Sequence, residues 1–364
     1  MNDISVCIIT RNEEHSIEKA ICSINPFVRE IILVDHYSDD KTAQIARELG
    51  AKVFLRKWDN HFAEARNFSI MQATAPVILI MDADEEFVGD NQALEEAAKK
   101  VIVSQEVAAR IEIQSLTANG QLSVSWITRM FPNNVDFIFK GRIHEQLYYR
   151  GGSPKVVNSS IRFYHKGYTQ EEINKKNKYQ RNISLLLLEH KEDPNNPYLL
   201  FQLGRTYGHM NEWIKSKKWF ERALDLIKAP YPNYHSTLLL DYANILMKLK
   251  EWDKLSNVIN TAIEFYPDYT DLYYIYGCAV IEARNPEWFP QIPDVFATCI
   301  EIGEVSKGKY ESVQGVGSYR SHYNLGLYFE LSGDIQLAEY HYRISFEQGF
   351  GLALERLNLL NQVK

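Results

Sequence analysis

The chain has 364 residues (42.3 kDa), of which 45% are apolar and 24% are charged. This balance excludes a disordered chain, and the length exceeds the roughly 250 to 300 residues at which single cores stop growing, so two domains are expected. The net charge of −7 is spread evenly along the sequence, which argues against nucleic acid as a partner. No apolar run approaches the ~20 residues of a membrane helix, and residues 1–12 lack a signal-peptide pattern. We therefore expect no membrane span and a cytoplasmic protein.

The first third of the chain alternates between short apolar runs and helical segments. The expected elements are strands at 5–9, 31–34, 52–55 and 77–81, with helices between them at about 17–24, 41–49 and 63–73. Short runs rich in Val and Ile are typical of strands that are buried on both faces of a parallel sheet. The alternation predicts a series of βαβ units and an α/β fold.

Polar residues follow three of these strands, at 10–13, at Asp35 and at Asp82 with Asp84. Ligands bind at this edge of open parallel sheets. Acidic residues also serve there as ordinary turn residues and helix caps, but three such groups at one edge favour a binding site. Asp82 and Asp84 are two residues apart, so both carboxylates can point to one side of an extended chain. Their hard oxygens suit Mg²⁺ or Mn²⁺ bound together with a diphosphate.

Two further candidates lie between residues 126 and 168. The sequence Gly-Arg-Ile-His-Glu at 141–145 follows an expected strand at 135–139, and His165 ends another at 161–165. His144 and Glu145 do not form a zinc-protease motif, because the third position of that motif is Tyr148. Two structural alternatives stay open: an ion pair from Glu145 to Arg142 or Arg129, and a structural role for the histidine at 165.

The last part of the chain predicts helical hairpins. Only one of 22 tyrosines precedes position 148, and strand signals end near 171. Residues 195–208 and 212–227 suit two antiparallel helices, and small residues then recur in pairs at a constant separation: Gly204 with Ala223, Ala243 with Ala262, and Gly326 with Ser345. The irregular period lies around the roughly 34 residues of tetratricopeptide repeats, with an insertion near 306–318. Such repeats could capture an extended peptide, mediate a homodimer or support the first domain.

Four motifs in order, VCIITRNEE, ILVDHYSDDKT, FAEARNFSI and VILIMDADEEF, resemble the GT-A nucleotide-binding half of family 2 glycosyltransferases over about residues 3–90. The resemblance implies a GT-A domain that binds a UDP-sugar and Mg²⁺ or Mn²⁺. The implied nucleotide-binding residues are Thr10, Asn12 and Glu13 at the nucleoside, Asp35 at the uracil, Ser38 and Asp39 around the same pocket, and Arg66 at the diphosphate. The implied metal-site residues are Asp82, Ala83 and Asp84, with His165 near the metal or the diphosphate. Glu145 becomes the candidate base for the acceptor, and His144 lies beside the nucleotide.

The two-part chain also resembles the bacterial glycosyltransferases that modify bacteriocin peptides, the glycocin S-glycosyltransferases. This implies an inverting enzyme that moves a sugar from UDP-glucose or UDP-N-acetylglucosamine to Cys or Ser of an acceptor peptide. The alternatives are a transferase that acts on an envelope glycan or another protein, and a non-catalytic repeat scaffold. The expected domains are a catalytic domain at 1–168, a connecting helix at 169–194 and helical repeats at 195–364.

Overall fold

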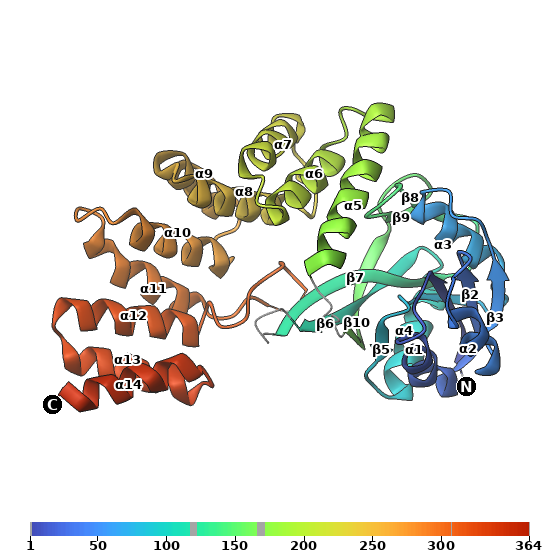
Figure 1. Ribbon diagram of the computed structural model, residues 1–364, viewed down its shortest axis with the longest axis horizontal. Helices are drawn as coiled ribbons and strands as arrows, with labels where there is room; N and C mark the ends of the chain where they lie inside the picture. The colour runs from blue at the N-terminus through green and yellow to red at the C-terminus, as the bar shows by residue number, and fades with distance from the viewer. Residues whose placement is uncertain (1, 117–121, 166–171, 307, 364) are drawn as a thin grey trace. The chain divides into compact units, whose positions relative to one another are not determined.

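The computed structural model describes residues 2–116, 122–165, 172–306 and 308–363 (Figure 1). Its contacts divide the chain into two compact units, Met1–Pro194 and Asn195–Lys364. No helix within these described ranges is both long enough and apolar enough to cross a membrane.

The first unit is built on an eight-stranded mixed sheet with the order β3-β2-β1-β4-β7-β6-β10-β5. Its strands are β1 (Asn2–Thr10), β2 (Val28–Asp35), β3 (Lys52–Leu55), β4 (Val77–Ile80), β5 (Glu85–Phe87), β6 (Val107–Leu116), β7 (Leu122–Pro132) and β10 (Lys155–His165). A separate two-stranded sheet joins β8 (Phe137–Lys140) to β9 (Gln146–Tyr149). The helices are α1 (Ile17–Ile24), α2 (Thr42–Glu48), α3 (Phe62–Met71), α4 (Asn91–Ser104) and α5 (Glu172–Glu192).

The four strands expected from the first third of the sequence form the parallel half of this sheet. β1 pairs with β2 and β4, β2 pairs with β3, and all three pairings are parallel. β1 and β4 are almost wholly buried, which explains their continuous Val and Ile runs. The register sets Thr10 opposite Asp35, so the carboxyl ends of β1 and β2 meet at one edge. This arrangement confirms the α/β prediction.

The other half of the sheet was not anticipated in full. β7 runs antiparallel to β4, β6 runs antiparallel to β7, and β10 lies parallel to β6. Strands β5, β6, β7 and β9 and helix α4 have no counterpart among the expected elements. This half supplies Glu85, Arg129 and His165 to the same edge that the parallel strands form.

Helix α5 lies within the first unit, Met1–Pro194. The backbone N–H of Arg142 donates to Glu189 Oε2 (2.8 Å), and Arg142 Nη2 lies 2.8 Å from Glu192 Oε1. The backbone bond to Glu189 attaches the last turns of α5 to the loop that carries Glu145, whereas the pair with Glu192 is an exposed ion pair that adds little.

The second unit consists of helices that pack as successive hairpins. They are α6 (Pro197–His209) with α7 (Trp213–Leu226), α8 (His235–Leu249) with α9 (Trp252–Phe265), α10 (Thr270–Ala283) with α11 (Ile292–Ile302), α12 (Tyr319–Ser332) with α13 (Ile335–Glu347), and α14 (Gly351–Val363). The tandem hairpins confirm the predicted helical repeats. The expected insertion lies in the connection between α11 and α12.

Glycine permits close packing within three of the hairpins. A Cβ atom added at Gly204 would lie 2.4 Å from the ring of Phe220, and one added at Gly326 would lie 2.5 Å from the ring of Tyr342. Gly277 has the same relation to Phe296, at 2.7 Å. In each of these hairpins, an aromatic side chain of the second helix thus packs directly against the backbone of the first helix.

Gly204→Val should therefore destabilise the second unit. The added methyl groups have no room beside Phe220, and such overpacking typically costs about 1 to 3 kcal/mol. For a unit of this size we expect the melting temperature to fall by roughly 2 to 4 °C for each kcal/mol. Gly351→Val is the matched control, because nothing lies within 4 Å of a Cβ atom at that exposed position. Equal thermal unfolding of both variants would contradict the packing argument.

Candidate active site

The ends of β1 and β2 are joined by side-chain hydrogen bonds around Asp35, which is 1% exposed. The backbone N–H of Ser38 donates to Asp35 Oδ1 (2.9 Å), and the Ser38 hydroxyl donates to Oδ2. Asn12 adopts a left-handed backbone conformation (φ 57°), and its N–H donates to Ser38 Oγ (2.8 Å) while its Oδ1 accepts from the Asp39 N–H (2.8 Å). Together with buried Thr10, these residues form one rigid edge of the site. The structure thus brings together five of the six residues expected at the nucleoside end.

Glu13 links this edge to Asp84. Its backbone N–H donates to Thr42 Oγ1 (2.8 Å), and its carboxylate accepts from Ser16 Oγ (2.7 Å). Burial raises the pKa of Glu13 against the opposing effect of the Ser16 hydrogen bond, and the nearby charge of Asp84 raises it further. Glu13 therefore lies within electrostatic reach of the Asp82–Asp84 segment.

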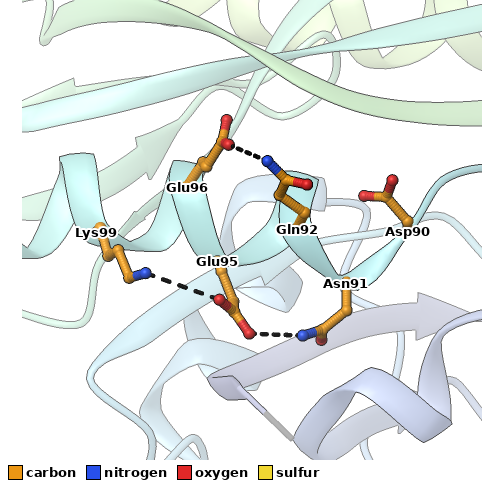
Figure 2. Close-up of a pocket in the computed structure, with 6 residues that line it drawn as sticks. All are labelled: Asp90, Asn91, Gln92, Glu95, Glu96 and Lys99. Atoms are coloured by element: carbon orange, nitrogen blue, oxygen red, sulfur yellow. Dashed lines mark hydrogen bonds and ion pairs between the residues drawn. The ribbon is translucent and has the colours of Figure 1, made fainter.

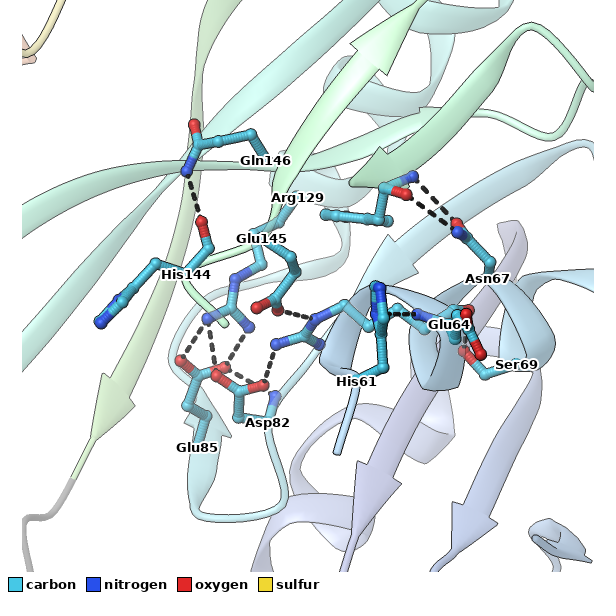
Figure 3. Close-up of polar contacts among 12 residues, drawn as sticks. His61, Glu64, Asn67, Ser69, Asp82, Glu85, Arg129, His144, Glu145 and Gln146 are labelled. Carbon is cyan, nitrogen blue, oxygen red and sulfur yellow. Dashed lines mark hydrogen bonds and ion pairs between the residues drawn. The ribbon is translucent and has the colours of Figure 1, made fainter. Parts of the chain in front are cut away.

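Asp82 lies between two buried arginines, Arg66 and Arg129, and Figure 3 labels Arg129 beside it. Arg66 Nη2 donates to its Oδ1 (2.9 Å) and Arg129 Nη2 donates to its Oδ2 (2.7 Å). Burial favours the neutral carboxyl group, but Arg129 and Arg66 outweigh it and hold the pKa of Asp82 well below its usual range. Arg129 also binds Glu85 (3.0 Å), whose pKa is raised to about 7 by burial despite this partner. Asp82 is thus a permanently charged junction between α3 and β7.

Glu145 shares Arg66 with Asp82. Arg66 Nε donates to Glu145 Oε1, and the side chain of Glu145 is only 11% exposed. The predicted alternative that Glu145 forms an ion pair is therefore confirmed, but its partner is Arg66. The two arginines expected as partners bind other carboxylates: Arg142 pairs with Glu192, and Arg129 pairs with Asp82. Among the described residues, none donates a hydrogen bond to Oε2 of Glu145.

Arg66 retains one donor that its carboxylate partners do not use. Its Nη1 is buried and has no hydrogen-bond partner among the residues that the structure describes. A buried guanidinium donor without an acceptor costs free energy, and an anionic ligand would satisfy it. The geometry therefore fits the expectation that Arg66 faces a diphosphate.

Asp84 and His165 form a second polar pair at the same edge. His165 Nε2 lies 3.0 Å from Asp84 Oδ2, and each side chain is about one third exposed. The hydrogen bond with Asp84 raises the pKa of His165, although burial opposes the charged form. Ser115 Oγ lies 3.5 Å from the other ring nitrogen and orients the imidazole.

A carboxylate and an imidazole side by side fit a divalent cation that also binds substrate phosphates. Asp82, expected as a third ligand, is instead engaged by the two arginines. Within the described ranges no group of three or more His, Cys, Asp or Glu side chains is arranged to hold a metal. A cation at this site would have two protein ligands and would take the remaining ones from the nucleotide or water.

The remaining predicted residues lie at the margin of the site. Ala83 is 5% exposed and packs into the hydrophobic core, so its side chain faces away from any ligand. His144 adopts a left-handed conformation (φ 53°), and its side chain points away from Asp82 and Glu145 in Figure 3. Its carbonyl accepts from Gln146 Nε2 (3.2 Å). We therefore place His144 beside the Glu145 loop rather than inside the network.

The sequence analysis missed Glu85, and it named Arg129 only as a possible partner of Glu145. Arg129 occurs in an otherwise largely apolar stretch of β7, and Glu85 follows Asp84 directly. A lone arginine beside buried Met130 and Phe131 requires a buried acidic partner. From the sequence, this requirement could have indicated that Arg129 has a buried acidic partner, but it could not identify which carboxylate that partner is.

A surface hollow beside α4 is unrelated to this site (Figure 2). Asn91 Nδ2 donates to Glu95 (2.6 Å), Gln92 Nε2 donates to Glu96 (2.8 Å), and Lys99 lies 3.7 Å from Glu95. These side chains satisfy one another, and none of the predicted site residues lines the hollow. We assign it no ligand.

Comparison with known proteins identifies the class of the first unit. Residues 5–143 match the family described as Glycosyl transferase family 2, so the chain carries a domain of that family. The SPbeta prophage-derived glycosyltransferase SunS of Bacillus subtilis (strain 168) is 30% identical over 234 residues, which cover 64% of this chain and 54% of SunS. A TPR repeat-containing protein of Synechococcus elongatus is 28% identical over 237 residues, covering 62% of this chain and 57% of the relative. The chain thus spans just over half the length of these relatives.

Solved structures also show a limited likeness. MamA matches with a TM-score of 0.38 and 18% identity, covering 50% of this chain and 95% of MamA. YrrB, a TPR protein, matches with a TM-score of 0.38 and 16% identity, covering 50% of this chain and 86% of YrrB. Scores this low add nothing to what the helical hairpins themselves establish.

Proposed function

We propose that the chain is an inverting, metal-dependent glycosyltransferase that moves a sugar from a UDP-sugar to a Cys or Ser side chain of a peptide. The observation that carries the proposal is the meeting of three groups at one sheet edge of a glycosyltransferase family 2 domain. These groups are the Asp84–His165 pair, Arg66 with its unused donor, and Glu145 with an open carboxylate oxygen.

The donor would lie along this edge with its base at β1 and β2. Asp35 and the backbone around Asn12 offer fixed acceptors and donors to the uridine, and Arg66 Nη1 offers a donor to the diphosphate. A divalent cation bound by Asp84 and His165 would neutralise charge that develops on the departing diphosphate. The imidazole favours Mn²⁺ over Mg²⁺, because Mg²⁺ prefers oxygen ligands alone.

The acceptor would enter beside Glu145. Arg66 fixes Oε1 of this carboxylate, and Oε2 would take the proton from the attacking thiol or hydroxyl. A carboxylate positioned by a second group is the usual arrangement of a general base. Attack from the face opposite the diphosphate would invert the anomeric configuration.

The peptide class of the acceptor rests on the helical repeats and on the resemblance to glycocin S-glycosyltransferases. Repeat helices present extended surfaces suited to peptides, whereas an envelope-glycan acceptor would not require them. There are two alternatives. The acceptor is another protein, or the repeats form a homodimer instead of binding the acceptor. The proposed domains are catalytic residues 1–168, helix 169–194 and repeats 195–364.

Mass spectrometry of reaction mixtures tests this function. Bacteriocin precursor peptides that contain Cys and Ser would be incubated with UDP-glucose or UDP-N-acetylglucosamine and Mn²⁺. We expect the mass of one hexose or one N-acetylhexosamine to be added, and we expect chelation by EDTA to abolish the addition because Asp84 and His165 would lose their cation. Transfer to a glycan but to no peptide would contradict the acceptor class. Undiminished transfer in EDTA would contradict metal dependence.

A further inference from the structure

A short segment of the second unit lies across the first helices of the repeats. The segment Lys309–Val313, here called the strap, belongs to the α11–α12 connection (Figure 1). Lys309 and the hydroxyl of Tyr310 (2.9 Å) both contact Asp268, and the ring of Tyr310 stacks on Tyr269 at a centroid distance of 4.4 Å. The strap therefore docks at the N-terminal end of α10.

The strap is held partly through its backbone. The Tyr269 hydroxyl donates to the carbonyl of Glu311, and the N–H of Val313 donates to Asp271 Oδ1 (2.9 Å). Asp271 Oδ2 accepts from the hydroxyl of Ser312 (2.5 Å). Proteins also hold bound peptides through hydrogen bonds from side chains to the peptide backbone, which do not depend on the peptide's sequence.

One charged contact adds selectivity. Glu311 Oε2 lies 2.8 Å from Arg205 Nη2 on α6, and the same guanidinium lies 2.8 Å from Asp241 of α8. Arg205 thus forms one ion pair with a carboxylate of the repeats, Asp241, and a second with a carboxylate of the strap, Glu311. An apolar or basic residue in the place of Glu311 would leave this second position unfilled.

The side chains of the strap are more exposed to solvent than those of the surface beneath it. Tyr269 and Asp271 are 0% and 4% exposed, whereas Lys309, Glu311 and Val313 of the strap are about half exposed. The ion pairs of such exposed side chains stabilise a protein only weakly. Tyr310 also packs against the hydrophobic core of the second unit, so lifting the strap would expose its ring together with hydrogen-bonding groups that the helices hold in place.

We infer that the surface formed by Arg205, Asp241, Tyr269 and Asp271 is a peptide-recognition site, and that the strap is its built-in occupant. The site selects a segment with the order aromatic, acidic, hydroxyl, as in Tyr310-Glu311-Ser312. A peptide of this chemistry binds there only when the strap is released. The inference does not depend on the sugar-transfer reaction.

A strap-opened chain tests the site directly. Tyr310→Gly, Glu311→Ser, Ser312→Gly and Val313→Ser together keep the length of the connection and remove the side-chain contacts of Tyr310, Glu311 and Ser312, while the Lys309–Asp268 ion pair stays. The probe is a fluorescein-labelled peptide with the strap sequence Lys-Tyr-Glu-Ser-Val-Gln, and binding is measured by fluorescence anisotropy. We expect saturable binding to the opened chain that is at least tenfold tighter than binding to the unaltered chain. A scrambled peptide and a peptide with Gln in place of Glu should each bind at least tenfold more weakly. Equal affinity for all three peptides, or no binding to an opened chain that circular dichroism shows to be folded, would overturn the proposal.

Hydrogen exchange of the full chain gives a second test that does not require the quadruple variant. Glu311→Ala removes only the contact with Arg205, so amides at 309–314 should exchange faster, by up to about fivefold, while amides of α10 keep their protection. If the amides of α10 lose protection together with the strap, the segment is an integral part of the helix packing and the proposal is wrong.

Discussion

Asp84→Ala should reduce sugar transfer by roughly 10²- to 10³-fold or more, the loss typical when a group that stabilises developing charge is removed. Asp84 offers one of the two side chains suited to a cation, and its described partner is His165 at 3.0 Å. Without the carboxylate, the imidazole alone would hold Mn²⁺ weakly. Isothermal calorimetry with UDP in the presence of Mn²⁺ should show a matching loss of affinity.

Two further variants separate this effect from a loss of fold. Asp136→Ala removes a carboxylate of the same unit that pairs with Arg150 (2.9 Å), and it should keep full activity. Asp82→Ala should instead lower the melting temperature, because it removes a shared partner of the buried cations Arg66 and Arg129. Unchanged UDP affinity and turnover in Asp84→Ala would refute the metal assignment, and unfolding comparable to that of Asp82→Ala would show a structural role.

The parallel half of the first unit could be predicted because each of its strands is a local signal. A run such as Val77–Met81 is apolar regardless of its neighbours, and it ends where charged residues begin. Because the carboxyl ends of parallel strands share an edge, local predictions at Thr10, Asp35 and Asp84 were enough to assemble one site. The helical repeats were predictable for a similar reason, since pairs of small residues recur along the chain.

The antiparallel half could not be predicted in this way, and neither could the charge network. Arg129 and its partner Glu85 are 44 positions apart in the sequence, and Glu145 and its partner Arg66 are 79 positions apart. Sequence alone offered Arg142 as a nearer partner for Glu145, but the sheet order decides which strands meet. The strap illustrates the same point, because a loop was expected near 306–318 while its contact with Arg205 depends on the stacking of three hairpins.

Glu145→Gln should leave UDP-sugar binding intact while lowering turnover. The amide keeps the shape of the side chain and can still accept from Arg66, but it cannot take up a proton. The loss should depend on the acceptor. A cysteine thiol has an unperturbed pKa of about 8.5 and is partly ionised near neutral pH, whereas a serine hydroxyl is not. We therefore expect kcat to fall more on a Ser peptide than on the matching Cys peptide.

Glu192→Gln is the matched control for this experiment. Glu192 also pairs with an arginine, Arg142 (2.8 Å), but its side chain is 62% exposed and lies on α5. The same change of charge at that place should leave kcat on both peptides unchanged. Raising the pH should restore part of the activity of Glu145→Gln on the Cys peptide, because the thiolate no longer needs a base, and should restore none on the Ser peptide. Equal losses on the two peptides with no recovery at high pH would show that Glu145 serves only to hold Arg66 against Asp82.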